Sequence, residues 1–449
     1  MLVFAGLAAV TLVFALRQVD EVILVATLTI LGGIALGILG LARFPLFLMV
    51  LVAIRTSLDD MKLDDLGLVQ PVSVIGVLLI GSSILWLIAR RRTVGLRPIS
   101  PVGKALVFYF VGLLLSTPAS LDPAVSATGA LKIGSAAALF IVLEQIYSDR
   151  PELLSRFLAA AALSLIVPVI GAWYQYLFRP EIDRVSGLIR VDSTFVHPNP
   201  LGTYMVLAAL LLIGTAYAFG PRGRLLTVLV VLPVLSVLLL TYARAAWGAL
   251  LLGIFYIASR LDRRLFAIML VGLLGLIAVV PTIVGRLGDL NDQQADPDAG
   301  NPNSLEWRVG YWQEVLPLVA QNPATGTGLD TVPLQTEDEL PPHNTFIQAF
   351  VEAGVIGLAG LMAMVVTTWI ALRRAVLHNR RKPHGPIAVA FAAAALSVFI
   401  QAFTENLVTG VFPLWYLSIG VAFFTAQHIR ELSPLDDGST PNPPQLVGA

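Results

Sequence analysis

The sequence predicts an all-α protein that crosses a membrane many times. Of its 449 residues, 57% are hydrophobic and only 13% are charged. The mean hydropathy is +0.81, which is far outside the range of soluble domains. Because the formal net charge is zero, no overall basic field points to nucleic acid. The positions of the charges therefore matter more than their sum.

Apolar runs long enough to form membrane-spanning helices of about 20 residues recur along the whole chain. They predict a transmembrane helical bundle of roughly 12 to 14 spans. The runs are 1–16, 21–42, 44–56, 71–90, 104–117, 126–147, 154–177, 198–219, 224–241, 244–259, 265–285, 345–372, 386–408 and 411–428.

The basic residues predict the orientation of these spans. With both termini in the cytoplasm, nineteen of the 29 Lys and Arg residues fall on the inner side and nine on the outer side, with Lys132 left inside a span. Cytoplasmic loops carry an excess of basic residues, so this orientation is the favoured one. It leaves two larger polar loops outside, at 178–197 and 286–344. The longer loop is expected to carry short helices.

One of these short helices is predicted in the stretch "NSLEWRVGYWQEVLPLVA". At helical spacing, Trp307, Tyr311, Val315 and Leu318 line one face, which predicts an amphipathic helix at the outer membrane interface. The following "QNPATGTGLD" has the glycines of a turn. The chain then returns to the membrane.

Three arginines stand where the predicted outer loops meet apolar segments. Arg244, at the tight turn in "LLLTYARAAWGALL", either snorkels to lipid headgroups or binds a substrate. Arg190 is either a solvated loop charge or part of the same site. Arg308 can pair with Glu306 or stack on Trp312 instead. Together the three arginines indicate an anion site, because guanidinium groups bind phosphate oxygens in pairs and stay charged.

Two histidines precede predicted helix starts. His197 comes before "PNP", where Asn199 is expected to cap a helix and Pro200 to occupy its first turn, which favours a structural role. His343 comes before Thr345 and Gln348, which have capping-box spacing. A helix N-terminus disfavours imidazolium, so His343 is expected to be neutral and able to act as a base. A purely structural role is the alternative.

Several catalytic classes lack their motifs here. The chain has no cysteine, and it contains no HExxH, Walker or G-x-S-x-G sequence. Zinc hydrolase, NTPase and serine hydrolase functions are therefore disfavoured.

The order of five motifs resembles the O-antigen ligase and polymerase family of bacterial membrane glycosyltransferases. The motifs are "TFVHPNPLG", "TYARAAW", "EWRVGYW", "NPATGTGLD" and "PHNTFIQAFVEAGVIGL". The resemblance covers about residues 190–360. It implies an N-terminal set of spans at 1–177 and a catalytic membrane region at 178–428 that includes the loop 286–344. A cytoplasmic disordered tail is expected at 429–449.

The resemblance also implies an activity. In that family an arginine at a turn between spans, an arginine in the long outer loop and a histidine near the end of that loop are implicated in transfer from an undecaprenyl-diphosphate-linked glycan. These roles fall here on Arg244, Arg308 and His343 as catalytic residues. The donor diphosphate would be bound by Arg190, Arg244 and Arg308. The supporting candidates are Glu306, Asn344, Asn199 and His197.

The chemistry implied is direct displacement at an anomeric carbon. Fixed arginines stabilise the charge on the departing diphosphate, and His343 accepts or orients the proton of the attacking hydroxyl. Transfer would invert the anomeric centre and would need no metal ion or other cofactor. The partners implied are the lipid-linked donor, a lipid, glycan or protein acceptor, and the bacterial cytoplasmic membrane, with the site on its outer face. Polymerase and ligase both remain open.

A lipid-linked oligosaccharide flippase or another polysaccharide exporter is the alternative function, because such transporters also have twelve to fourteen spans. A transporter needs polar groups at mid-depth of its spans, and this chain has few. A purely structural membrane subunit would not need the arginines.

Overall fold

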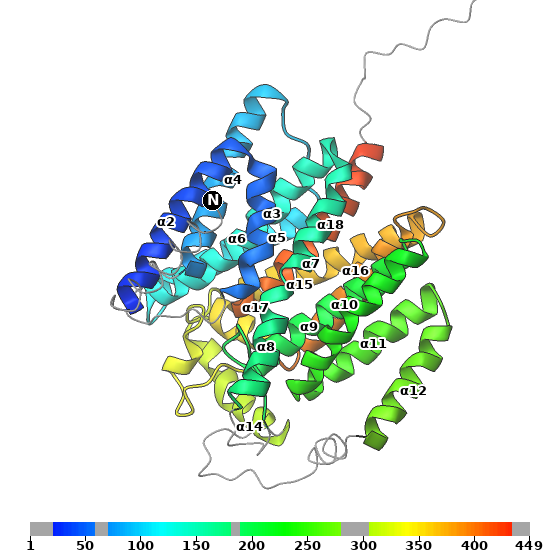
Figure 1. Cartoon of the computed structure of the whole chain (residues 1–449). Coiled ribbons are helices and arrows are strands. Elements are labelled where there is room, and N and C mark those ends of the chain that lie inside the picture. The colour runs from blue at the N-terminus through cyan, green and yellow to red at the C-terminus, as the bar shows by residue number, and fades with distance from the viewer. Residues whose placement is uncertain (1–20, 59–70, 181–188, 280–304, 433–449) are drawn as a thin grey trace, which may run out of the picture.

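The computed structural model describes residues 21–58, 71–180, 189–279 and 305–432. These residues form α-helices, short 3-10 helices and loops, and no β-strand occurs among them (Figure 1). The predicted all-α polytopic fold is confirmed.

The helices follow one another with few long connections. They are α2 (Glu21–Ala42), α3 (Phe44–Ile54), α4 (Pro71–Thr93), α5 (Pro101–Ser116), α6 (Pro123–Asp149), α7 (Leu154–Leu163), α8 (Ile166–Phe178), α9 (Pro198–Ala216), α10 (Pro221–Leu240), α11 (Arg244–Arg260), α12 (Arg264–Val279), α14 (Leu305–Val315), α15 (Thr345–His378), α16 (Gly385–Gln401), α17 (Leu407–Gly410) and α18 (Phe412–Leu432).

Seven of the described helical stretches are long and apolar enough to cross a membrane: Val72–Thr93, Pro101–Ala119, Pro123–Asp149, Pro151–Phe178, Pro198–Ala216, Pro221–Leu240 and Thr345–His378. Three shorter apolar helices are Thr29–Ala42, Phe44–Ser57 and Gly385–Gln401. The predicted run 154–177 is divided between α7 and α8. The predicted run 1–16 lies outside the described residues, as does the end of the run 265–285.

Prolines and short polar residues set where the helices begin. The ring of proline fixes a helical φ and removes an N–H that has no partner in the first turn, and α5, α6, α9 and α10 all begin with proline. Ser100 caps α5, since its hydroxyl accepts from the N–H of Gly103 at 3.2 Å. Asp122 caps α6 in the same way. The boundaries of the spans are thus encoded locally.

The helices form one bundle. α5 packs along α15, α6 packs along α18, and α9 contacts both α10 and α16. α16 also packs against α11 and α15, and its run Ala392–Ala395 is completely buried. Small side chains allow close approach of helices that gain little from hydrophobic association inside a membrane. α14 and the loops that follow it gather at one end of the bundle (Figure 1).

The amphipathic face predicted for α14 is confirmed, and it packs against other parts of the protein. Tyr311 and Val315 are buried in a small cluster to which Trp307 and Leu318 also belong. The cluster is completed by Val332, Leu340, Ile347 and Val351, which come from the loop after α14 and from the first turns of α15. The apolar stripe therefore docks α14 onto α15.

α15 is interrupted at Gly354, where the loop after α14 enters the helix. Gly354 has φ +63° and ψ −164°, so the ladder of helical hydrogen bonds breaks there. The loop supplies the missing partners through its main chain. The N–H groups of Thr327 and Gly328 donate to the carbonyls of Val351 and Glu352 at 3.1 and 2.9 Å.

The same exchange occurs in the other direction. The N–H groups of Val355 and Ile356 donate to the carbonyls of Pro323 and Ala324 at 2.9 and 3.2 Å. Broken backbone is tolerated within a membrane-spanning helix where protein groups satisfy it. We call this exchange between residues 323–328 and 351–356 the main-chain splice.

Gly354→Ala is expected to destabilise the protein by on the order of 2 kcal/mol or more, because a positive φ strains any side chain. A Cβ at Gly354 would also lie 2.4 Å from the carbonyl carbon of Ala324. The unfolding midpoint in detergent measures the effect. The matched control is Gly310→Ala in α14, where a Cβ meets no atom within 4 Å. Equal midpoints for the two variants would contradict the role of the splice.

Candidate active site

Arg190 is the first of the predicted site residues that the fold fixes in place. Its side chain is only 7% exposed although it lies in a loop. Its Nε donates to the carbonyl of Thr241 at 2.9 Å, and its Nη2 donates to Oδ1 of Asn199 at 3.0 Å. Arg190 therefore joins the turn before α11 to the start of α9. The simpler alternative of a solvated loop charge is wrong.

The start of α9 differs from the prediction in which residue caps it. His197 is the N-cap, because its Nδ1 accepts from the N–H of Asn199 at 3.1 Å. The prediction that Asn199 caps this helix is wrong. Since the ring of His197 takes over the cap, the Asn199 amide is free to bind Arg190 through Oδ1 and Glu405 through Nδ2, the latter at 3.0 Å.

Glu405 lies at the centre of the arginine cluster. It follows α16, and it is 8% exposed. Burial raises the pKa of Glu405 to about 7, while Arg308, Arg190 and the hydrogen bond from Asn199 act in the opposite direction. A carboxyl group between two guanidinium groups balances part of their charge. Because its pKa is near neutral, this balance changes with pH.

Arg308 approaches Glu405 from α14. Its Nη1 donates to the carbonyl of Thr404 at 3.0 Å, and burial lowers its pKa while Glu405 raises it. The Nε of Arg308 is buried and has no hydrogen-bond partner among the described residues. The alternative in which Arg308 only stacks on Trp312 is wrong, because the guanidinium reaches across to the end of α16.

His343 is fixed by its neighbours in the loop before α15. The Tyr311 hydroxyl donates to the carbonyl of Leu340, and the Trp312 indole N–H donates to the carbonyl of Pro342 at 2.7 Å. His343 has φ +50°, a left-handed conformation that is unusual outside glycine and is often found at functional sites. The Tyr311 phenol and the Trp312 indole, both on α14, thus fix the position of the histidine.

The surroundings of His343 keep its ring neutral. Burial, with smaller contributions from Arg308 and His197, lowers the pKa of His343 to about 4. Its Nδ1 is buried and has no hydrogen-bond partner among the described residues. The ring of Trp307 stands edge-on to it, with centroids 6.3 Å apart. The predicted neutral imidazole is supported, and burial is the main cause.

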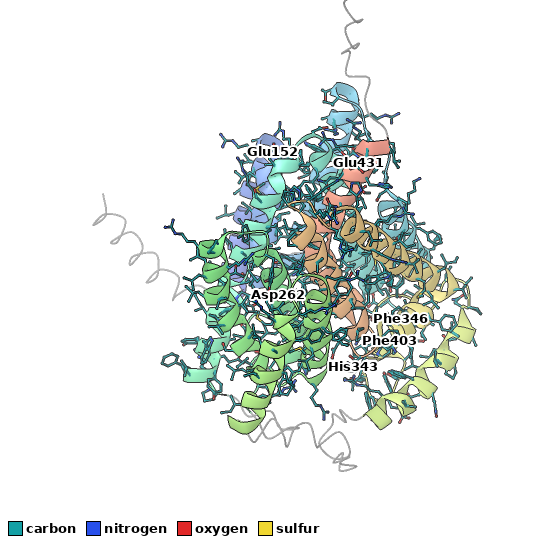
Figure 2. All side chains as sticks on the ribbon, turned by 90° about the vertical axis from the view of Figure 1, so that its right-hand side faces the viewer. Glu152, Asp262, His343, Phe346, Phe403 and Glu431 are labelled. Atoms are coloured by element: carbon teal, nitrogen blue, oxygen red, sulfur yellow. The ribbon has the colours of Figure 1, made fainter. Side chains whose placement is uncertain are left out.

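Figure 2 shows where this histidine lies in the molecule. His343 is at the same end as Phe346 and Phe403, whose ring centroids are 4.7 Å apart. Glu152 and Glu431 are at the opposite end. The candidate site therefore occupies one end of the helical bundle.

The cap of α15 also differs from the prediction. Asn344 is the N-cap, and its Oδ1 accepts from the N–H groups of Phe346 and Ile347 at 3.0 and 3.1 Å. The Thr345 hydroxyl instead donates to the carbonyl of Glu405 at 2.7 Å. The expected capping box of Thr345 and Gln348 is therefore absent. This arrangement ties the end of the His343 loop to Glu405.

Fewer contacts are described for two other candidate site residues, Arg244 and Glu306. Arg244 is the first residue of α11, half-buried, three residues after the Thr241 carbonyl that Arg190 binds. Glu306 lies in α14, but its side chain is outside the part of the structure that is described. The fold thus brings together Arg190, Asn199, Arg308 and His343, with Arg244 in the adjoining turn.

This arrangement can bind an anion and accept a proton in one place. Arg308 Nε and His343 Nδ1 are the buried polar atoms of the site that no described group satisfies. Buried polar groups are usually hydrogen-bonded, and an exception at a functional site points to a ligand. The guanidinium suits a phosphate oxygen, and the neutral imidazole suits a hydroxyl.

Sequence reasoning missed Glu405 as a member of the site. The sequence signal was the polar stretch "TEN" near the end of the predicted run 386–408, with its glutamate close to a span end. An ionisable residue at such a position needs a partner. Its partners, Arg190 and Arg308, are far away in the sequence, so the pairing could not be predicted.

Part of the chain resembles a known protein family. Residues 227–362 match the O-antigen ligase family model. The matched stretch includes Arg244, Arg308 and His343, and it excludes Arg190 and Glu405.

The chain is also similar to the exopolysaccharide production protein ExoQ of Rhizobium meliloti (strain 1021). The two are 24% identical over 293 residues, an alignment that covers 60% of this chain and 64% of ExoQ. The chain thus aligns with less than two thirds of that relative. The match at residues 227–362 and the similarity to ExoQ confirm the predicted resemblance to the O-antigen ligase and polymerase family.

Proposed function

We propose that this protein is a membrane glycosyltransferase that moves a glycan from an undecaprenyl-diphosphate-linked donor to an acceptor hydroxyl during surface polysaccharide assembly. The observation that carries the proposal is the meeting of Arg190, Arg308 and Glu405 with a neutral His343 at one end of the bundle. The O-antigen ligase match and the similarity to a protein named for exopolysaccharide production support the same class.

The arginines would stabilise the leaving group. When the bond from the anomeric carbon to the diphosphate oxygen breaks, its electron pair leaves with the diphosphate, which gains negative charge. Arg308, half-buried and with Nε unpartnered among the described residues, offers a donor to that charge. Fixed donors of this kind act more strongly in the transition state than in the ground state. Arg244, at the adjoining turn, would bind the second phosphate.

His343 would take the proton of the acceptor. The hydroxyl oxygen forms the new bond to the anomeric carbon as the diphosphate departs from the other side, and the proton passes to the neutral ring. A single displacement of this kind inverts the anomeric centre. Because the arginines supply the positive charge, the proposed reaction needs no metal ion.

Glu405 would act as a positioning residue. It lies between Arg190 and Arg308 and is linked to the first through Asn199. Its carbonyl also accepts from Thr345 at the end of the His343 loop. Through these contacts it would hold the two guanidinium groups at a fixed distance from the histidine.

Transfer by the purified full-length protein tests the proposal. A defined undecaprenyl-diphosphate oligosaccharide serves as donor, and a second lipid-linked repeat, a lipid core and a wall polymer are offered in parallel as acceptors. We expect one glycan-transfer product of inverted configuration, formed at the same rate with EDTA. Movement of the donor across a vesicle membrane without a new glycosidic bond would instead identify a flippase.

Glu405→Gln tests the positioning role through pH. The wild-type rate is expected to rise as pH increases through about 7, because the carboxyl loses its proton and then holds both arginines. The variant should lack this limb and be slower by up to on the order of a hundredfold at high pH, the usual scale for misplaced groups. A wild-type profile that is flat between pH 6 and 8 would contradict the role.

The same variant has a stability readout. The pKa of Glu405 is raised from 4.5 to about 7 in the folded protein. Between these values the folded protein keeps a proton that the unfolded chain has lost, so its stability falls as pH rises. Glu405→Gln should remove that decrease. Unfolding midpoints measured across this pH range show whether it does.

Single cysteines test the side of the membrane on which the site lies. The chain contains no cysteine, so Glu339→Cys and Arg381→Cys each create one. Both positions are exposed, one beside the His343 loop and the other beyond the far end of α15. An impermeant thiol reagent is expected to label only the first in intact cells and both after permeabilisation. The reverse pattern would place the site in the cytoplasm.

A further inference from the structure

A cavity of about 650 Å³ lies at the end of the molecule opposite the candidate site. It is formed by the last turns of α15 and α18 and the start of α5. Figure 2 shows Glu431, which borders this cavity, far from His343. α15 is a membrane-spanning helix that begins beside His343 and ends at the cavity, so the two sites lie at opposite faces of the membrane. The proposed transfer reaction does not use this cavity.

The part of the cavity that lies deeper along α15 is an apolar groove. Along α15 the whole cavity extends from Thr367 to His378, and its apolar lining residues there include Ile370, Ala371 and Leu377. The twelve residues of helix from Thr367 to His378, with eleven rises between them, span about 16 Å. One leaflet of the hydrocarbon core is about 15 Å deep, half of the whole. The apolar groove and the basic end of the cavity together are therefore about as long as one leaflet is deep.

The part of the cavity nearest the ends of α15 and α18 is basic, and we call it the mouth. It joins a second cavity of about 460 Å³, with which it shares Asn379, Gln427 and Glu431. The basic residues that line the two cavities are Arg374, His378, Lys382, His384, His428 and Arg430. The only acidic residue among the linings is Glu431.

Glu431 does not neutralise this mouth. It lies 2.9 Å from Nε2 of His378 and 4.0 Å from Nζ of Lys382, so one carboxylate serves two basic groups across the ends of α15 and α18. Arg374 and Arg430 add two permanent charges. An anion of more than one negative charge, or one phosphate with its hydrogen-bond acceptors, matches this surplus.

We infer that this cavity binds a phospholipid with a net negative headgroup. Its acyl chain occupies the groove of α15, and its phosphate lies at the basic mouth between Arg374 and Lys382. A soluble phosphate would leave the apolar groove unused, and an uncharged lipid would leave the cations unused. The apolar groove suits an acyl chain, and the positive charge of the mouth suits an anionic headgroup. A phospholipid with a net negative headgroup has both.

Binding of defined lipids to the purified full-length protein tests this site. Phosphatidylglycerol and phosphatidylcholine with identical acyl chains are titrated in detergent, and the lipid-bound fraction is measured by native mass spectrometry. We expect one saturable site that prefers phosphatidylglycerol about tenfold or more, since each basic residue near a surface attracts anionic lipid by a factor of about five. Equal affinity for the two lipids would overturn the inference.

Paired variants separate the two halves of the site. Arg374→Gln should weaken phosphatidylglycerol binding about fivefold, whereas Arg373→Gln, at an exposed neighbour that does not line the cavity, should not. Thr367→Trp should fill the groove and abolish the saturable site, whereas Val366→Trp, 48% exposed and outside the lining, should not. Unfolding midpoints without lipid confirm that each variant is folded. Equal effects within either pair would contradict the assignment.

A soluble competitor distinguishes a lipid from a free phosphate. Glycerol 3-phosphate at millimolar concentration should leave the phosphatidylglycerol-bound fraction unchanged, because it lacks the acyl chain that fills the groove. Displacement by glycerol 3-phosphate, with no effect of Thr367→Trp, would identify a soluble phosphate as the ligand and overturn the lipid assignment.

Discussion

His343→Asn is expected to lower the rate of glycan transfer by on the order of a hundredfold or more, the usual scale for loss of a general base. Asparagine tolerates the left-handed backbone that this position requires, φ +50°, so the loop should keep its shape. The α15 cap is also unchanged, because Asn344 provides it. Transfer by the purified variant, with donor binding measured separately, gives the result.

The pH profile distinguishes loss of a base from loss of structure. Because the pKa of His343 is about 4, the ring is still neutral at mildly acidic pH, so its protonation should add a separate fall in the wild-type rate near pH 4, below the change near pH 7 that Glu405 causes. His343→Asn should abolish that acidic limb. Donor binding should survive, because the arginines are untouched, and His428→Asn, in the lining of the cavity far from the site, should behave as wild type. Near-normal transfer by His343→Asn would end the catalytic assignment.

Arg308→Lys is expected to lower transfer by about a hundred- to a thousandfold, the range seen when one transition-state donor is removed. Lysine keeps the positive charge but loses the planar fork, and with it the unpartnered Nε and the bond to the Thr404 carbonyl. The loss should appear in the rate at saturating donor more than in donor affinity, because the charge on the leaving diphosphate grows in the transition state.

The control for this variant is Arg373→Lys, at an exposed position near the far end of α15. Its transfer rate should match the wild type, and both variants should keep the wild-type unfolding midpoint within a few degrees. Full turnover by Arg308→Lys would show that this arginine only anchors α14. Arg190→Lys then becomes the decisive variant, because Arg190 is the other arginine held in this cluster.

The sequence was sufficient for features that depend on local pattern. The helical spacing of Trp307, Tyr311, Val315 and Leu318 predicted α14 and its apolar face, although not the protein groups that bury that face, and the apolar runs predicted most of the helices. Arg308 and His343 were singled out by their places in the long loop, and the family resemblance gave them catalytic roles. Each of these inferences uses residues that are close together in the chain.

Features that depend on distant partners could not be predicted. Cap propensity favoured Asn199, but the amide of that residue binds Arg190 and Glu405, so the ring of His197 caps the helix instead. The break at Gly354 was hidden because the apolar pattern of α15 continues through it. In both cases a tertiary contact overrides the local preference.

The main-chain splice fixes when the site can form during synthesis. Residues 323–328 leave the ribosome before α15, whose carbonyls at Val351 and Glu352 they need. The hydrogen bond from Arg308 forms later still, because the Thr404 carbonyl that accepts it is 96 residues further along the chain. A nascent chain that stops after α15 therefore has the loop but no assembled site. The proposed transferase would become competent only when its last helices insert, so unfinished chains would not consume its proposed lipid-linked donor.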